Sequence, residues 1–227
     1  MTSTEALPPD SGAPPANATE RAYSTVLEWI ESRQIGAGTV LDERRMSSAL
    51  NISRTPLRNA LNRLLGEGYL TRLANGTIIV REVGVGEVLE LLFIRRLLEP
   101  EAALLAAGRI PIRRLEQLRE AALNPELRRD GQIATWRAGD ELHVLVGTYC
   151  SNRSLAEILK TARRRIVISS VERVPGRNAR ATQEHLNILE ALIAGDGEKA
   201  RDAMRLHLEN IAEGYLATYG IRSDHAG

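Results

Sequence analysis

Cysteine, lysine and aromatic residues are all scarce in this sequence of 227 residues. Cys150 is the only cysteine, which excludes an internal disulfide framework and fits a reducing compartment. Lys160 and Lys199 are the only lysines, so nearly all of the basic charge is arginine. Aromatic residues make up only 4% of the chain, so its cores have to be built mainly from Leu, Ile, Val and Ala.

Long apolar runs are absent as well. No run approaches the ~18 residues that a membrane span requires, and the N-terminus lacks the hydrophobic core of a signal peptide. We therefore expect a cytoplasmic protein with no membrane association. Hydrophobic residues still make up 43% of the chain, which is enough for the cores of one large or two small domains. The formal net charge of +1 identifies no partner, so the distribution of charge matters more.

The N-terminal end is predicted to be a disordered tail followed by a helix. Residues 1–19 contain four prolines and many small polar residues, which cannot bury enough surface to offset the entropy of ordering. From Glu20 onward, apolar residues recur every three or four positions, as in an amphipathic helix. The glycines of "IGAG" at 35–38 are expected to end this helix because glycine favours turns.

Two short helices separated by a tight turn are predicted next. A short strand at 39–41 leads to Asp42, which stands where the N-cap of a helix over 43–50 belongs. A turn of two residues then leads to Ser53, the expected cap of the second helix. Pro56 falls in the first turn of that helix, where its missing N–H costs little.

A β-hairpin follows the second short helix. The stretch "TRLANGTIIVRE" at 71–82 places two β-prone runs on either side of Asn75-Gly76, which is a strong hairpin signal. We therefore predict a first domain over 20–82, and "VGVGE" at 83–87 is predicted to be a linker.

The remainder of the chain favours helices throughout. Residues 88–220 are predicted to form a second, all-helical domain of about six helices, and 221–227 a short tail. Proline, asparagine and glycine separate the helical segments. The predicted helices cover 88–108, 111–123, 131–149, 153–174, 178–194 and 196–219.

The second short helix has one apolar and one cationic face. On a helical wheel the leucines of "SRTPLRNALNRLL" share one arc. Five arginines and no carboxylate lie between Arg44 and Leu64, whereas a solvated face would normally mix charge signs. The planar guanidinium suits guanine edges and phosphates. A solvent-facing helix beside a hairpin is the alternative, but a short helix, a tight turn, a cationic helix and a hairpin in this order predict a winged helix-turn-helix that binds double-stranded DNA. The polar arc carries Thr55, Arg58, Asn59 and Asn62.

The stretch "RRMSSALNISRTPLRNALNRLLGEGYL" at 44–70 resembles the DNA-binding segment of GntR-type bacterial regulators. The resemblance implies a homodimer on a palindromic operator, with the wing tip entering the minor groove. Two positions depart from the family pattern, because Ala37 replaces a proline and Asn59 replaces an acid. Arg45 and Arg63 are equally well explained as surface charge. The residues that the resemblance assigns to DNA binding are Arg44, Ser53, Arg54, Thr55, Arg58, Asn75 and Gly76.

Three of the four histidines lie on the apolar faces of predicted helices in the second domain. They are His143, His185 and His207. A single inward histidine is usually a core residue with a hydrogen-bond partner. Three on one bundle could instead converge on a divalent metal, which would compensate the cost of burying all three imidazoles. The pattern alone leaves both readings open.

Four further segments resemble the FCD ligand-sensing domain of one GntR subfamily. They are "RRLLEPEAALLAA" (95–107), "LHVLVGTYCSNRSL" (142–155), "EHLNILEALIAGD" (184–196) and "MRLHL" (204–208). In many such domains an aspartate and three histidines hold Zn²⁺ or a similar metal below an effector cavity. The resemblance therefore implies a metal site at His143, His185 and His207.

The aspartate of that metal site is displaced in this sequence. The family places it four residues before the first histidine, where this chain has Gly139, and Asp140 stands three residues before. Residues three apart still share a helical face, so Asp140 is the candidate fourth ligand. The alternatives are three protein ligands with water or effector, or a site without metal.

Arg95 is the candidate effector-binding residue. Its neighbours on the helical face are leucines and alanine, so it is expected to point inward, where a buried arginine needs an acidic partner. One reading is an internal salt bridge with Glu99, four residues later. The other is a bidentate seat for an effector carboxylate, as the resemblance implies.

The combined expectation is a DNA-binding transcriptional regulator, acting as a repressor, that a small organic acid releases from its operator. A regulator for which the metal ion is itself the signal is an alternative. A metal-dependent hydrolase is a more remote one, because the sequence has no "HExxH" and no nucleophile motif, and we expect no enzymatic activity.

Overall fold

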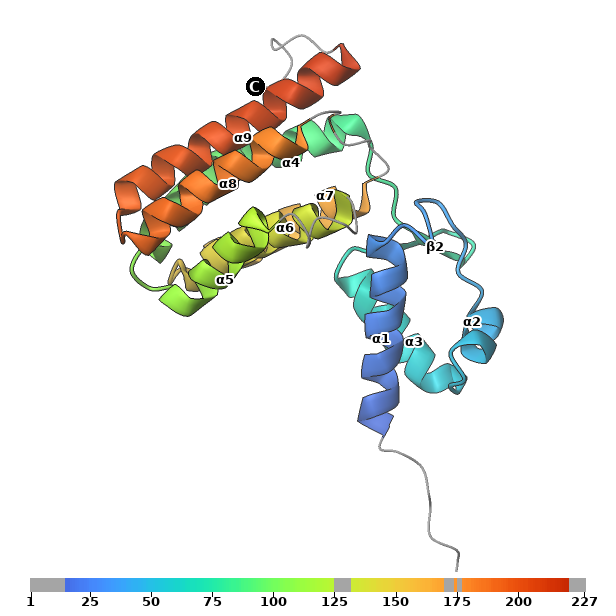
Figure 1. Ribbon diagram of the computed structural model, residues 1–227. Coiled ribbons are helices and arrows are strands. Elements are labelled where there is room, and N and C mark those ends of the chain that lie inside the picture. Colours follow the sequence, from blue (N-terminus) through green and yellow to red (C-terminus); the bar gives the residue numbers. More distant parts are fainter. Residues whose placement is uncertain (1–14, 125–131, 170–173, 175–176, 221–227) are drawn as a thin grey trace, which may run out of the picture. The chain divides into compact units, whose positions relative to one another are not determined.

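The computed structural model describes residues 15–124, 132–169, 174 and 177–220. The chain forms two compact units that divide between Glu82 and Val83 (Figure 1). The first unit has three helices and a two-stranded sheet, and the second has six helices, within the described ranges. The predicted fold class, mostly α with a small hairpin in the first unit, is confirmed.

The first unit begins earlier than predicted. Helix α1 covers Pro15–Glu31, so the prediction of disorder for 1–19 is wrong for its last residues, and the rest lies outside the described part. Proline at the first helical position has no amide hydrogen to leave unpaired, and its fixed φ suits a helix, so the proline that suggested disorder is compatible with a helix start.

Two helices follow in the predicted order. Helix α2 covers Glu43–Ala49, and the Asp42 carboxylate accepts hydrogen bonds from two backbone amides at its start, as predicted for an N-cap. Helix α3 covers Arg54–Gly66 and packs against α1. Leu57, Leu61 and Leu64 of α3 are fully buried, and each contributes about 1.5–3 kcal/mol to holding the helix in place.

The hairpin consists of β1 (Leu70–Arg72) and β2 (Ile78–Val80), which pair antiparallel. Leu73 and Thr77 close the loop between them, and Gly76 adopts a positive φ of 84° there. This is a three-residue loop with glycine in the left-handed position. The strand predicted at 39–41 is reduced to one bridge, from Val40 to Ile79.

The second unit contains the predicted helices with two corrections. Helix α4 (Val85–Ala106) begins inside the segment predicted as a linker, because Gly84 occupies the N-cap, where glycine is tolerated. Helix α7 (Arg153–Ile168) ends before the predicted 174, and 170–173 lie outside the described residues. The other helices are α5 (Ile112–Leu123), α6 (Gln132–Tyr149), α8 (Asn178–Ile193) and α9 (Gly197–Tyr219).

Helix α6 lies in the middle of the second unit, in contact with α4, α5, α7 and α8. Helix α9 packs along α4 and α8 (Figure 1). The core between them is aliphatic and includes Cys150, which is buried as expected for a core thiol. This packing brings one face each of α4, α6, α8 and α9 together around polar side chains. Among the described residues, no helix is both long and apolar enough to cross a bilayer.

Candidate nucleic-acid interface and metal centre

Helix α3 exposes the face opposite its buried leucines. Arg54, Thr55, Arg58 and Asn59 are all exposed there. Ser53 stands at the N-cap position, but its side chain makes no capping hydrogen bond, so the predicted cap is present in backbone conformation only. Arg44 is also exposed, on α2. The two helices therefore present the predicted DNA-binding residues to solvent.

Arg58 is paired with an acid that the sequence analysis did not include. Its Nε donates to Glu43 Oε2 at 2.6 Å, and the two side chains are 60% and 28% exposed. The pair links α2 to α3 and uses Nε, so the two terminal guanidinium nitrogens take no part in it. Glu43 immediately precedes the arginine-rich segment 44–64, so a search for acids confined to that segment misses it.

The wing is connected to α3 through Arg72. Its NH1 donates to the Gly76 carbonyl and its NH2 to Asn62 Oδ1, both at 3.3 Å. The Asn75 side chain accepts from the Thr77 amide at 3.0 Å, which stabilises the loop. The predicted wing tip is thus exposed, and its amide side chain is engaged in the turn.

Arg63 has a structural role instead. It pairs with Glu20 and Glu67, and its guanidinium lies 3.7 Å from the ring centre of Tyr23. The contacts with Glu20 and Tyr23 join α3 to α1. Arg45 is 90% exposed at its side chain and reaches Asp42 only at 3.8 Å, as expected for surface charge.

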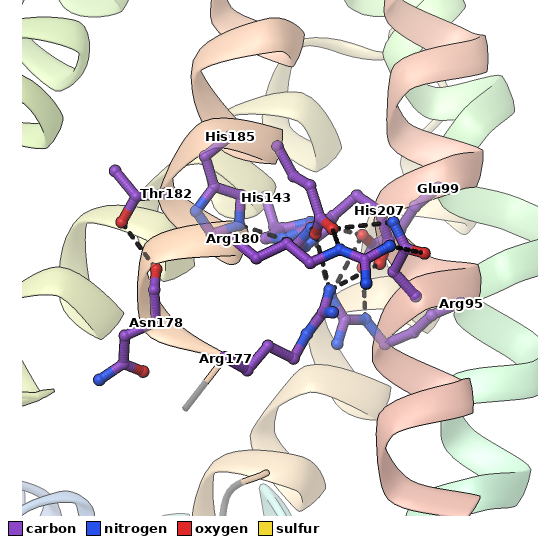
Figure 2. Close-up of polar contacts among 11 residues, drawn as sticks. Arg95, Glu99, His143, Arg177, Asn178, Arg180, Thr182, His185 and His207 are labelled. Atoms are coloured by element: carbon purple, nitrogen blue, oxygen red, sulfur yellow. Dashed lines mark hydrogen bonds and ion pairs between the residues drawn. The ribbon is translucent and has the colours of Figure 1, made fainter. Parts of the chain in front are cut away.

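Three imidazoles converge in the second unit. His143 of α6, His185 of α8 and His207 of α9 point toward one another in Figure 2. His207 Nε2 lies 3.2 Å from His143 Nε2 and 3.1 Å from His185 Nε2. One ligand atom from each residue falls within 4.8 Å of the others. His143 is 5% exposed and His207 1% exposed, so the cluster is largely shielded from water.

Two buried carboxylates orient two of these three rings. His143 Nδ1 lies 2.6 Å from Glu99 Oε2, and His207 Nδ1 lies 2.8 Å from Glu184 Oε2. When each Nδ1–H donates to its carboxylate, each Nε2 presents a lone pair to the cluster. Two lone pairs that face each other at 3.2 Å repel unless a proton or a metal cation lies between them.

The electrostatics keep two of the imidazoles neutral. Burial, followed by the proximity of the other histidines, holds the pKa of His185 well below 6.5. Burial also holds the pKa of His207 well below that value, with contributions from His143 and Arg95. Metal binding requires neutral imidazole, so both rings are in the ligand form at neutral pH.

The cluster fits a divalent metal in its donor set and its spacing. Zn²⁺ bound tetrahedrally at about 2.0–2.1 Å holds adjacent ligand nitrogens about 3.3 Å apart. The two short Nε2 separations are close to that value. The carboxylates on the opposite ring nitrogens are the partners that metal-binding histidines commonly have.

Asp140 does not join this group, contrary to the prediction. Its carboxylate contacts Arg163 NH2 instead, and its backbone carbonyl accepts from the same nitrogen at 3.1 Å. Position 139 is the one that faces the cluster. A Cβ added to Gly139 would lie 2.3 Å from Cε1 of His185. The His185 ring therefore occupies the space into which a side chain at 139 would project. Asp140 follows one residue later on the helix, so its side chain points in another direction, toward α7.

Arg95 adopts the internal salt bridge that the sequence left as one of two readings. It is 5% exposed, and its Nε and NH2 reach the two oxygens of Glu99 at 2.7 and 3.2 Å. Burial raises the pKa of Glu99, but the charge of Arg95 and the hydrogen bond from His143 outweigh it and hold that pKa well below 4.5. The Arg95 fork is therefore already engaged by a carboxylate of the protein.

Arg163 of α7 is a buried cation that the sequence analysis missed. It is 8% exposed, and NH1 lies 3.8 Å from Glu99 Oε1. Burial and the nearby charge of Arg95 lower its pKa to about 9. The signal in the sequence was weak, because Arg163 begins the run "RRR", which is typical of an exposed face.

Glu184 is the second residue that the sequence did not reveal. Besides His207, its carboxylate accepts from Arg177 NH2 at 2.6 Å and from Asn210 Nδ2 at 2.8 Å, and it pairs with Arg180 at 3.3 Å. Glu184 is adjacent to His185 in the sequence, yet it supports the histidine of another helix. Such a pairing depends on the approach of α8 and α9.

Comparisons with known proteins agree with this architecture. The family described as "Bacterial regulatory proteins, gntR family" matches residues 18–80, and the FCD domain matches 90–210. The Nta operon transcriptional regulator of Aminobacter aminovorans is 33% identical over 129 residues, 56% of this chain and 59% of that protein. The HTH-type transcriptional repressor RspR of Escherichia coli K12 is 28% identical over 201 residues, 86% of this chain and 87% of its own length.

A solved structure shares the fold. E. coli McbR/YncC superposes with a TM-score of 0.73 at 19% identity, covering 89% of this chain and 98% of that one. The helical unit with its histidine cluster coincides with the FCD match, and the helix-turn-helix with its hairpin coincides with the other. The chain is a transcriptional regulator and not an enzyme, and it belongs to the GntR family of bacterial regulatory proteins, in the group that carries an FCD domain.

Proposed function

We propose that this protein is a cytoplasmic homodimeric repressor that binds a palindromic operator and releases it when a small carboxylate enters the helical unit above a divalent metal. Residues 20–82 would form the DNA-binding domain and 88–220 the sensing and dimerisation domain. The observation that carries the sensing part is the histidine cluster, in which the Nε2 atoms of His143 and His207 lie 3.2 Å apart while buried carboxylates contact the opposite ring nitrogens.

DNA binding is assigned to the exposed polar face of the first unit. Helix α3 itself contains no acid that could balance the charge of these arginines. Glu43, which pairs with Arg58, belongs to α2. Phosphate contacts give affinity and salt dependence, and base contacts give specificity. The residues proposed to contact DNA remain Arg44, Ser53, Arg54, Thr55, Arg58, Asn75 and Gly76.

The metal would be held by His143, His185 and His207, and Zn²⁺ is the ion we propose. A bound divalent cation would supply a positive charge and an open coordination position for an oxygen atom of the effector. Around it, Glu99 and Glu184 orient two rings, and the surrounding aliphatic core excludes water. Removal of either carboxylate is expected to weaken metal binding about 10- to 100-fold.

Regulation requires that the effector bind one dimer state more tightly than the other. A ligand with equal affinity for the operator-competent and operator-incompetent dimers shifts nothing. The recognition helices of a dimer must reach half-sites about one helical turn apart, roughly 34 Å. We therefore propose that effector binding changes the separation of the two DNA-binding units.

Fluorescence anisotropy with duplexes tiled across the gene's own upstream region tests the DNA-binding part. We expect one duplex to bind in a salt-dependent manner with two protomers per site. Arg58→Ala should reduce the preference for that duplex over random DNA by about 1–3 kcal/mol, while Arg45→Ala serves as the matched surface control. Equal weakening on both duplexes would make Arg58 a phosphate contact. Absence of salt-sensitive binding to any duplex would refute the proposal.

Native mass spectrometry and chelation test the metal part. The purified protein is expected to carry one divalent ion per protomer, lost in His207→Ala. If chelation abolishes carboxylate binding and leaves operator affinity unchanged, the metal is a cofactor of sensing. If operator affinity itself changes on chelation, the alternative holds and the ion is the signal. A protein that never retains a divalent ion would contradict both.

A further inference from the structure

We infer that Arg163 is the side chain that receives the effector's carboxylate, and that Asp140 is an internal anion which the effector displaces. The inference rests on the proposed function, because it takes the effector to be a small carboxylate. It replaces Arg95 in the predicted role and gives Asp140 a role other than metal ligation.

Arg163 has unused hydrogen-bonding capacity inside the protein. Its Nε and NH1 are buried and have no hydrogen-bond partner in the part of the chain that the structure describes. Only NH2 is hydrogen-bonded, to the carboxylate and carbonyl of Asp140. A buried guanidinium that leaves two nitrogens without acceptors is costly, and an arriving carboxylate supplies two oxygens in the geometry that a guanidinium edge matches.

The charges around Arg163 are shared unevenly. Glu99 lies between two arginines, but it binds Arg95 at 2.7 and 3.2 Å and approaches Arg163 only to 3.8 Å. Asp140 is thus the main counter-ion of Arg163. The Asp140 side chain is 29% exposed, whereas that of Glu99 is 1% exposed. Of the two carboxylates, Asp140 is therefore the one that can turn toward water when an effector carboxylate takes its place on Arg163.

Arg163 also stands beside the histidine cluster. The carboxylate of Glu99 connects them, with one oxygen 3.8 Å from Arg163 NH1 and the other 2.6 Å from His143 Nδ1. On α6, Gly139 has no side chain that could compete with an effector anion, and the His185 ring fills the space beside it. An anion bound next to the three histidines therefore meets Arg163, and the protein carboxylate it competes with is Asp140.

Arg95 is a poorer seat for the effector. Its Nε and one terminal nitrogen already reach both oxygens of a fully buried carboxylate, which His143 also contacts. Displacing Glu99 would leave two buried cations and disturb a histidine of the cluster. Displacing Asp140 disturbs neither.

The test measures carboxylate binding to the full-length Zn²⁺-loaded protein by isothermal titration calorimetry, with acetate, lactate, malate and citrate as probes. We expect at least one probe to bind, Arg163→Met to weaken it about 10- to 100-fold, and Asp140→Asn to tighten it about tenfold because the competing charge is gone. Arg164→Met, the neighbouring arginine on α7, is the matched control and should leave binding unchanged. Circular dichroism verifies that each variant is folded. If Arg163→Met does not fold, Arg163→Lys takes its place and is expected to weaken carboxylate binding by a smaller factor.

The opposite signs of the two substitutions separate this role from a structural one. If Asp140→Asn weakens binding as Arg163→Met does, the pair only stabilises the fold and the inference fails. It also fails if no probe binds, or if binding survives Arg163→Met and is lost in Arg95→Met. Operator affinity without carboxylate, measured in parallel, tests the DNA-binding proposal alone, and Arg163→Met should not change it.

Discussion

Glu99 is the buried carboxylate that pairs with Arg95 inside the helical unit. It is 1% exposed, it binds Arg95 through both oxygens, and it accepts from His143. Glu99→Gln preserves the shape but removes the charge that neutralises Arg95. Loss of one partner of a buried ion pair costs about 3–5 kcal/mol because the other charge stays buried and unpaired. We expect the free energy of unfolding to fall by that amount.

Urea denaturation at pH 7, monitored by circular dichroism, measures this loss. Glu101→Gln on the same helix is the matched control, because the Glu101 side chain is 55% exposed and reaches Arg201 only at 3.9 Å. The control should change the free energy of unfolding by less than about 0.5 kcal/mol. A loss below about 1 kcal/mol for Glu99→Gln would refute the view that Glu99 neutralises a buried cation.

The same residue sets a pH dependence. The pKa of Glu99 is held well below 4.5 in the folded protein, chiefly by Arg95 against the effect of burial. A depressed folded-state pKa contributes stability above the unfolded value and loses it as the pH falls through the folded value. The difference in unfolding free energy between the native protein and Glu99→Gln should therefore have its largest value near pH 7 and decrease below about pH 4.5. A difference that grows on acidification would have the wrong sign.

Three further outcomes are expected. Gly139→Ala should destabilise the protein by about 1–3 kcal/mol and weaken Zn²⁺ binding, because the new Cβ meets the His185 ring at 2.3 Å. Gly147→Ala on the same helix has open space around it and should be neutral or slightly stabilising in the same melts; equal effects would contradict the clash. Glu43→Ala should free Arg58 from its 2.6 Å pair, raising affinity for random DNA while lowering the ratio of operator to random binding in anisotropy titrations. An unchanged ratio would show that the pair does not orient Arg58. EDTA should lower the melting temperature of the native protein but not of His207→Ala, because a ligand that binds only the folded state stabilises it.

Local patterns predicted the order of elements well. Leucine spacing in α3, the N-cap at Asp42 and the Asn75-Gly76 turn are each determined within a few residues, and the structure places all three as expected. Local signals failed where a residue type has two uses. The local pattern predicts disorder around Pro15 and a linker around Gly84, whereas both residues stand at helix starts in the structure.

The sequence predicted the three histidines of the cluster but not the residues that surround them. Three inward histidines could be found from helical periodicity alone, since each stands on an apolar stripe. Their partners could not be found in this way. Glu184 supports a histidine of α9 although it neighbours one of α8, and Asp140 faces α7 because one helical step turns a side chain by about 100°.

The sequence by itself determined that the chain has a cationic helix braced by leucines and a helical unit with three inward histidines. These features follow from periodicity and charge, which act over neighbouring residues. Only the tertiary structure decided that Glu99 binds Arg95, that Glu43 holds Arg58, and that Arg163 is buried with two nitrogens lacking hydrogen-bond partners. Such pairings depend on how helices approach one another and on which face each turns inward, and burial then makes each unpaired charge costly.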